Sequence, residues 1–135
     1  MIDPRTHIRI ARPSRDLVAA ERFYVDGLEL MVLYRASAAG EGEHDLLMLG
    51  WREAGWHFEL TRDPADPLQP SPTPDDLFVL YLNGPVDASL VERLVAAGGT
   101  QVAAHNAYWD RYGVTIEDPD GYRLVLCERA WSNAG

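Results

Sequence analysis

A proline-rich segment in the middle of the chain constrains the fold more than any other feature. Residues 62–76 of the 135-residue sequence carry five prolines (Pro64, Pro67, Pro70, Pro72 and Pro74) and four aspartates. Proline fixes φ and removes a backbone donor, which excludes this stretch from helix interiors and paired strands. We therefore expect an extended linker that divides the chain into two parts.

The part before the linker predicts a strand, a helix and three more strands. Residues 7–11 alternate, so Ile8 and Ile10 share the face that we expect to cover the helix. Ser14 is the expected N-cap of the helix, and Gly27 its expected C-cap. Strands are predicted at 30–35, 45–49 and 56–61, the first two being joined by a connector at 36–43.

The part after the linker repeats this order. A strand is predicted over 77–83, a helix from Asp87 to Gly98, and a short strand over 100–103. An aromatic connector at 105–111 then leads to a final hairpin. Because the same order of elements occurs twice, we expect an internal repeat of about 55 residues.

The final hairpin is the most distinctive motif. Thr115–Leu126 reads strand, tight turn, strand, with Pro119, Asp120 and Gly121 in the turn. Tyr122, Leu124 and Leu126 share one strand face. The run Glu-Asp-Pro-Asp-Gly-Tyr before an alternating strand resembles the last hairpin of the vicinal oxygen chelate superfamily, which includes glyoxalase I, extradiol dioxygenases, and fosfomycin and bleomycin resistance proteins.

The resemblance implies a fold and a domain organisation. Three further segments resemble the superfamily. They are His7 at the start of the first strand, residues 16–30 at the helix and its end, and residues 57–61 on the fourth strand. The implied fold is α+β, with paired β-α-β-β-β modules that form a curved eight-stranded sheet around one cavity, the helices lying outside. We expect a single glyoxalase-like domain over 1–135, with module one at about 6–61, the linker at 62–76 and module two at about 77–129.

Strand alternation and the resemblance together give candidate cavity residues. His7 and Glu59 are the catalytic candidates, and we predict that Arg9 forms an ion pair with Glu59 inside the cavity. The aromatic connector is either a loop pinned to the sheet or a lid over the cavity mouth. Apolar cavity candidates are Leu77, Val79 and Val125. The ligand-binding candidates are His7, Arg9, His57, Glu59, Tyr81, Asn106, Tyr108, Trp109, Thr115 and Arg123.

A metal site is incomplete in this sequence. Catalytic members of the superfamily hold one divalent metal from four positions, which fall here on His7, Glu59, Leu77 and Val125. Two of these cannot ligate, whereas a catalytic site needs at least three N or O ligands. We therefore expect no cofactor. If a divalent metal binds, His7 and Glu59 would hold it, with His57 or His105 as the remaining side chains able to complete an unorthodox site.

Charge and cysteine content narrow the setting. A net charge of −9 argues against nucleic acid and anionic membranes as partners. Cys127 is the only cysteine, so no intramolecular disulfide forms and a cytoplasmic setting fits best. Open sheet edges and the resemblance favour a homodimer.

Three functions remain open from the sequence. The first is a metal-independent protein that binds a small molecule in the sheet cavity, its acidity and four tryptophans suiting a cationic, aromatic ligand. The second is a lyase, isomerase or dioxygenase-like enzyme that uses His7 and Glu59, with or without a divalent metal. The third is a non-catalytic interaction module whose cavity is filled by its own side chains.

Overall fold

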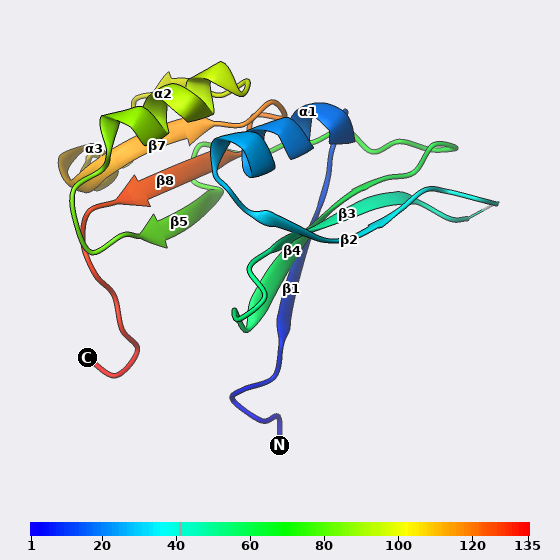
Figure 1. The fold of residues 1–135 in the computed structure, drawn as a ribbon, viewed down its shortest axis with the longest axis horizontal. Coiled ribbons are helices and arrows are strands. Elements are labelled where there is room, and N and C mark those ends of the chain that lie inside the picture. The colour runs from blue at the N-terminus through cyan, green and yellow to red at the C-terminus, as the bar shows by residue number, and fades with distance from the viewer. Residues whose placement is uncertain (41) are drawn as a thin grey trace.

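The computed structural model describes residues 1–40 and 42–135, so Glu41, within the connector expected at 36–43, lies outside the described residues. Within these residues the strands form two four-stranded sheets (Figure 1). Sheet A has the strand order β1-β4-β3-β2, and sheet B has the order β5-β8-β7-β6. The predicted α+β fold of two β-α-β-β-β modules is confirmed.

The two modules share the order β-α-β-β-β, and the second has an additional short helix, α3, before its third strand. In each sheet the first and last strands of the module pair in parallel, and the other pairs are antiparallel. The first module consists of β1 (Ile8–Pro13), α1 (Leu17–Glu21), the π-helical η1 (Arg22–Gly27), β2 (Met31–Ala36), β3 (Asp45–Gly50) and β4 (Trp56–Arg62). The second consists of β5 (Leu77–Tyr81), α2 (Ala88–Ala96), β6 (Thr100–Val102), α3 (Ala107–Tyr112), β7 (Gly113–Glu117) and β8 (Arg123–Cys127).

The helices of the two modules pack against each other, and glycine permits their close approach. A Cβ added to Gly27 would lie 3.0 Å from Leu94 Cδ2 and 3.2 Å from Ala97 Cβ. Gly27 was expected to be a C-cap, but the backbone takes a positive φ two residues later, at Glu29 (66°). Gly27 therefore serves helix packing, and that expectation was wrong.

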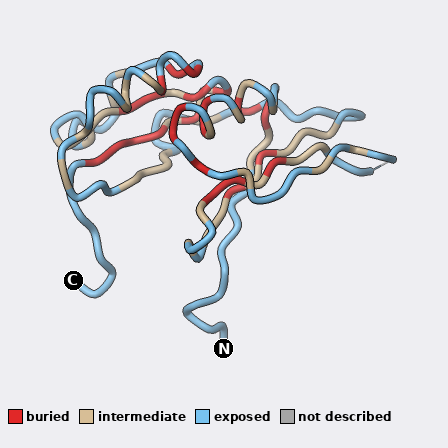
Figure 2. Tube along the Cα trace, viewed as in Figure 1, coloured by how far each residue is buried: buried red, intermediate tan, exposed pale blue. Residues whose placement is uncertain are grey.

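One core joins both modules. Phe23 and Tyr24 of η1, Leu94 of α2, and Leu124 and Leu126 of β8 are all buried in a single cluster. Figure 2 shows the buried segments gathered where the sheets meet the helices, with the start of β1 exposed. Tyr122, Leu124 and Leu126, which were predicted to share one strand face, are all buried.

The first strand departs from the expectation. Ile8 and Ile10 were predicted to cover the helix, but they are 57% and 55% exposed. β1 is the edge strand of sheet A. The apolar face of β1 extends beyond the part of the sheet that the helices cover. Alternation therefore predicted correctly that Ile8 and Ile10 share a face, but the described chain leaves that face largely exposed.

The turn at 118–122 fastens module two to the start of the first helix. Tyr24 Oη donates to Asp118 Oδ2 at 2.6 Å, and Ser14 Oγ donates to Asp120 Oδ2 at 2.6 Å. Ser14 is therefore not the N-cap that the sequence predicted; Asp16 caps α1 by accepting from two backbone amides. All four of these side chains are buried, so two buried hydrogen bonds link the first module to the turn of the second.

Candidate functional site

Four of the predicted side chains come together on one face of sheet A. His7 precedes β1 and Arg9 lies on it, while His57 and Glu59 lie on the neighbouring β4. His7 Nε2 lies 2.7 Å from His57 Nδ1, and Arg9 Nε donates to His57 Nε2 at 3.2 Å. Arg9 and Glu59 are within the predicted ion-pair distance, with Arg9 Nη1 3.7 Å from Glu59 Oε1, but neither residue lines the cavity in which the pair was expected. The pair is open on one side, because the Arg9 side chain is 50% exposed and that of Glu59 only 12%.

Arg9 sets the tautomers of both imidazoles. An arginine can only donate, so Nε2 of neutral His57 must be the acceptor and its proton sits on Nδ1. That Nδ1–H then donates to Nε2 of His7, whose own proton sits on Nδ1. In the neutral pair every ring nitrogen of His7 and His57 is therefore either protonated or already accepting a hydrogen bond.

The environment of His57 keeps it neutral. Burial lowers the pKa of His57, and the neighbouring His7 and Arg9 lower it further, while Glu59 opposes them. An imidazolium here would lose the hydrogen bond from Arg9. The cluster therefore contains a neutral His57, hydrogen-bonded to His7, beside one Arg–Glu pair.

A cavity of about 330 Å³ lies where the two modules meet. Its walls are mostly apolar and aromatic, and it includes His57 of the cluster. Leu77 and Val79, both predicted cavity residues, belong to its lining. The lining residues are Ile10, Arg12, Trp56, His57, Phe58, Leu77, Phe78 and Val79.

The three aromatic rings of this cavity pack edge to face. The Phe78 ring of β5 lies 5.7 Å from the Trp56 ring and 5.4 Å from the Phe58 ring, both on β4. Edge-to-face packing holds rings in fixed positions. The cavity thus has an aromatic wall to which both modules contribute.

Arg12 is the charged residue of this cavity, and sequence reasoning did not identify it as a site residue. Its guanidinium carbon lies 4.7 Å from the centre of the Tyr122 ring. Nη1 of Arg12 is buried without a hydrogen-bond partner among the described residues. Alternation places Arg12 on the face of Ile8 and Ile10, which was expected to be core.

The predicted aromatic residues form a second cluster on module two. The Trp109 ring lies 5.0 Å from Tyr108 and 6.5 Å from Tyr81. Trp131 packs on Tyr81 at 6.3 Å, and Arg129 donates to Tyr108 Oη at 3.2 Å. The sequence prediction missed both of these residues. No contact that the described residues make joins this cluster to the His7–His57 cluster.

The remaining candidates have structural partners or are enclosed. Asn106 caps the short helix α3 by accepting from Tyr108 N at 3.0 Å, and the sequence did not predict this helix. Arg123 forms an ion pair with Glu117 at 3.4 Å. Thr115 is buried, and its hydroxyl finds no partner in the described chain. Val125 is fully buried, and His105 lies 3.9 Å from Asp75.

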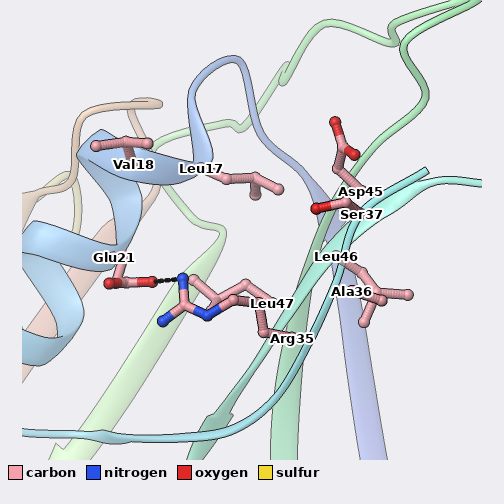
Figure 3. Close-up of a pocket in the computed structure, with 9 residues that line it drawn as sticks. All are labelled: Leu17, Val18, Glu21, Arg35, Ala36, Ser37, Asp45, Leu46 and Leu47. Carbon is pink, nitrogen blue, oxygen red and sulfur yellow. Dashed lines mark hydrogen bonds and ion pairs between the residues drawn. The ribbon is translucent and has the colours of Figure 1, made fainter. Parts of the chain in front are cut away.

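A second hollow, of about 280 Å³, lies between α1 and the β2–β3 pair (Figure 3). Its charged groups already have partners. Arg35 Nη1 lies 2.6 Å from Glu21 Oε1, and Asp45 Oδ1 accepts from Ala38 N at 2.7 Å. None of the predicted site residues lines it, so we do not regard it as the candidate site.

The donor set fits a metal poorly. Among the residues that the structure describes, no three His, Cys, Asp or Glu side chains are arranged to hold an ion. The predicted pair of ligands, His7 and Glu59, is present, but the Nε2 lone pair of His7 accepts from His57 and Glu59 is paired with Arg9. Within the described chain, no helix is long and apolar enough to span a membrane.

Comparison with known proteins identifies the family to which the chain belongs. Two family models match, the YycE-like N-terminal domain over residues 8–61 and the YycE-like C-terminal domain over residues 75–128. The uncharacterized protein YycE of Bacillus subtilis is 40% identical over 120 residues, which are 88% of this chain and 85% of that protein.

Solved structures extend the likeness to the superfamily. A YycE protein of unknown function from Bacillus subtilis, a candidate glyoxalase or fosfomycin resistance protein, gives a TM-score of 0.85 at 36% identity, over 96% of this chain and 94% of that one. At 18% identity, where only the fold is informative, glyoxalase I of Leishmania major gives 0.67 over 88% and 83% of the two chains. The antibiotic-binding protein TnmS3 of Streptomyces sp. CB03234 gives 0.59 over 93% and 97%, also at 18% identity. The chain belongs to the YycE-like family, within the vicinal oxygen chelate superfamily.

Proposed function

We propose that the protein binds a small organic molecule, without a metal, in the cavity between the modules. The observation that carries the proposal is the lining of that cavity. Eight residues from both modules line a half-open cavity of about 330 Å³ with an aromatic wall, and one of them, His57, also belongs to the polar cluster on sheet A. Sites that are mostly apolar, with few polar groups at fixed positions, are typical of ligand binding.

The state of the histidines supports metal independence. A metal ligand must offer a lone pair, and the imidazoles of His7 and His57 use theirs in the hydrogen bonds from Arg9 and within the pair. Leu77 and Val125 stand at the other two positions where the superfamily resemblance implies metal ligands, and neither side chain can bind a metal. To bind a metal, the protein would therefore have to break the hydrogen bonds and the ion pair of the His7–His57 cluster. It would then offer the metal only two ligands, His7 and Glu59.

The fold neighbours are compatible with a binding role. One of them, TnmS3, is an antibiotic-binding protein. Because fold does not determine function, this likeness supports the proposal only together with the cavity. A cytoplasmic location belongs to the same proposal, on the ground that Cys127, the one cysteine of the sequence, is a free, buried thiol.

We also propose that the protein is a homodimer. β1 and β5 are edge strands of their sheets, and β1 exposes Ile8 and Ile10 beside the cavity. Exposed apolar edge strands pair readily with a second chain. Ile10→Lys should therefore yield a monomer by sedimentation velocity if the wild type is a dimer through this edge. A wild-type monomer at high concentration would contradict the proposal.

A ligand screen on metal-free protein tests the proposed function. Fragments with apolar rings are added to protein treated with chelator, and backbone amide shifts are followed by NMR. We expect the shifts to cluster on β1, β4 and β5. Val79→Phe, which fills the cavity, should weaken binding, whereas Val95→Phe on the exposed face of α2 should not.

Two results would count against it. Binding that appears only after zinc, nickel, manganese or iron(II) is added would favour an enzyme using His7 and Glu59. Absence of any binder at the cavity across a broad screen would favour an interaction module with a filled cavity.

A further inference from the structure

We propose that the ligand carries a carboxylate and that Arg12 binds it, with an aromatic or other apolar body lying against Trp56, Phe58 and Phe78. This inference rests on the proposed function and names the chemical class of the molecule in that same cavity. It follows from one unpaired guanidinium and from the walls around it.

Arg12 makes no hydrogen bond and no ion pair with any described residue. Its Nη1 is shielded from solvent and lacks an acceptor. The neighbouring Arg15 shows what an arginine here ordinarily does, since it bonds Gln69 Oε1 at 3.1 Å and the carbonyl of Pro70 at 3.4 Å. A buried donor without a partner is costly, and native proteins keep few of them.

Three carboxylates act on this region, Asp76, Asp118 and Asp120, and each has other hydrogen-bond donors. Asp76 is exposed and accepts from Thr73 N at 2.6 Å, and the bonds from Thr73, followed by the charge of Arg12, lower its pKa; it forms no ion pair with Arg12 among the described residues. Asp120 accepts from Ser14 Oγ and from the backbone amide of Arg15. Asp118 accepts from Tyr24 and from two backbone amides of its own turn. All three carboxylates therefore have hydrogen-bond donors without Arg12, and its N–H groups remain available for another acceptor.

The position of Arg12 is held by the fold. Its guanidinium lies over the Tyr122 ring at 4.7 Å, and Tyr122 Oη donates to the Pro13 carbonyl at 3.3 Å. Stacking on an aromatic ring holds the guanidinium plane while its edge stays free for hydrogen bonds. A planar carboxylate matches that edge with two parallel hydrogen bonds.

The rest of the cavity selects an apolar body. Its lining contains three aromatic rings and several aliphatic side chains, and it contains no acidic residue. An ammonium group would meet Arg12 without a counter-charge in the lining. This reverses the expectation of a cationic ligand that net charge had suggested, because local charge at the cavity outweighs the distant surface charge.

The test compares three probes on metal-free protein. They are 2-naphthoate, its neutral isostere 2-naphthalenemethanol, and inorganic phosphate, with binding followed through the Trp56 indole N–H signal in NMR titrations. We expect naphthoate to bind roughly tenfold to a hundredfold more tightly than the alcohol, as for a hydrogen bond to a charged group. Arg12→Gln should abolish that preference and leave binding of the alcohol unchanged.

Two further variants control the result. Arg12→Lys keeps the charge but not the planar edge, so it should retain only part of the preference. Arg52→Gln makes the same change in net charge at an exposed arginine and should change nothing. If Arg12→Gln does not fold, the role of Arg12 is still tested by comparing the binding of naphthoate and of the alcohol to the wild type and to Arg12→Lys.

Equal binding of naphthoate and the alcohol would overturn the assignment of Arg12 while leaving the proposed function standing. Binding of phosphate alone would also overturn it, because the apolar body would then play no part. Failure of all three probes to bind would overturn the inference, and if the broad screen also failed, the proposed function with it.

Discussion

Tyr24→Phe should destabilise the protein by about 2–3 kcal/mol, because it removes a buried hydrogen bond to a carboxylate. Tyr24 is 1% exposed and Asp118 is 5% exposed, and 2.6 Å separates Tyr24 Oη from Asp118 Oδ2. Asp118 Oδ1 keeps its bonds from the amides of Asp120 and Tyr122, at 2.8 Å and 3.0 Å. Oδ2 loses its side-chain donor in a site that water does not reach.

The loss of stability in Tyr24→Phe should also depend on pH. Burial raises the pKa of Asp118, while the bonds from Tyr24 and the backbone amides oppose that rise. With a raised pKa the native state binds the proton more tightly than the unfolded chain. The contribution of this carboxyl to stability is therefore full below its ordinary pKa and is lost as pH rises through the raised value. Tyr24 limits that loss, so the deficit of the variant should be larger at pH 7 than at pH 4.

Urea unfolding followed by circular dichroism measures the change. At unchanged m-value the midpoint should fall, and Tm should drop by roughly 6–12 °C for a domain of this size. Tyr108→Phe is the matched control, since its hydroxyl accepts from Arg129 at a residue 39% exposed. That variant should lie within about 0.5 kcal/mol of wild type. A Tyr24→Phe deficit as small as the control's would refute the reasoning.

Three further predictions follow from other contacts. Because the pKa of His57 is lowered, the unfolded chain takes up protons first, and stability should fall as pH drops below about 6.5; His57→Asn should flatten this part of the stability-versus-pH curve measured by urea unfolding. Gly99→Ala would place a Cβ 2.6 Å from Phe23 Cε1 and 2.8 Å from Ile116 Cγ2, so it should cost at least roughly 3 kcal/mol in thermal unfolding, whereas Gly84→Ala, with nothing within 4 Å, should be nearly neutral. Glu59→Gln should cost only about 0.5–1 kcal/mol, less than a fully buried pair would, because its partner is half-exposed; a loss above 3 kcal/mol would show that the pair is buried in solution.

Local patterns predicted much of the fold because they report local physics. Alternation identified the face of Leu124 and Leu126, and both are fully buried. Asp87 caps α2 as expected, and Gly121 takes φ of +90° in the predicted turn. In each case the residue type and its immediate neighbours decide the outcome.

Contacts between distant parts of the chain were not predictable in the same way. Ser14 looked like an N-cap, but its hydroxyl bonds a carboxylate 106 residues away. Alternation placed Ile8 and Ile10 on one face without showing that β1 is an edge strand. Arg12 was not predicted as a site residue for the same reason. Its position at the cavity depends on how β5 lies against the first module, which is a contact between distant parts of the chain.

The candidate site was predicted in part for the same reason. His7, Arg9, His57 and Glu59 were chosen from strand alternation, and parallel pairing of β1 with β4 brings them together. The direct contact between the two imidazoles depends on the register of that pair, which alternation does not give. Arg129 and Trp131 carry no periodic signal, and they join the aromatic cluster only through tertiary contacts.

The ¹⁵N side-chain NMR spectrum of His7 and His57 at pH 8, before and after one equivalent of zinc, tests whether the protein binds its ligand without a metal. If the imidazole lone pairs are occupied as the hydrogen bonds indicate, both residues should be neutral with the proton on Nδ1, and zinc should change nothing. Stoichiometric zinc binding that shifts the Nε2 resonances of either histidine, and that His7→Ala abolishes, would contradict metal-free binding.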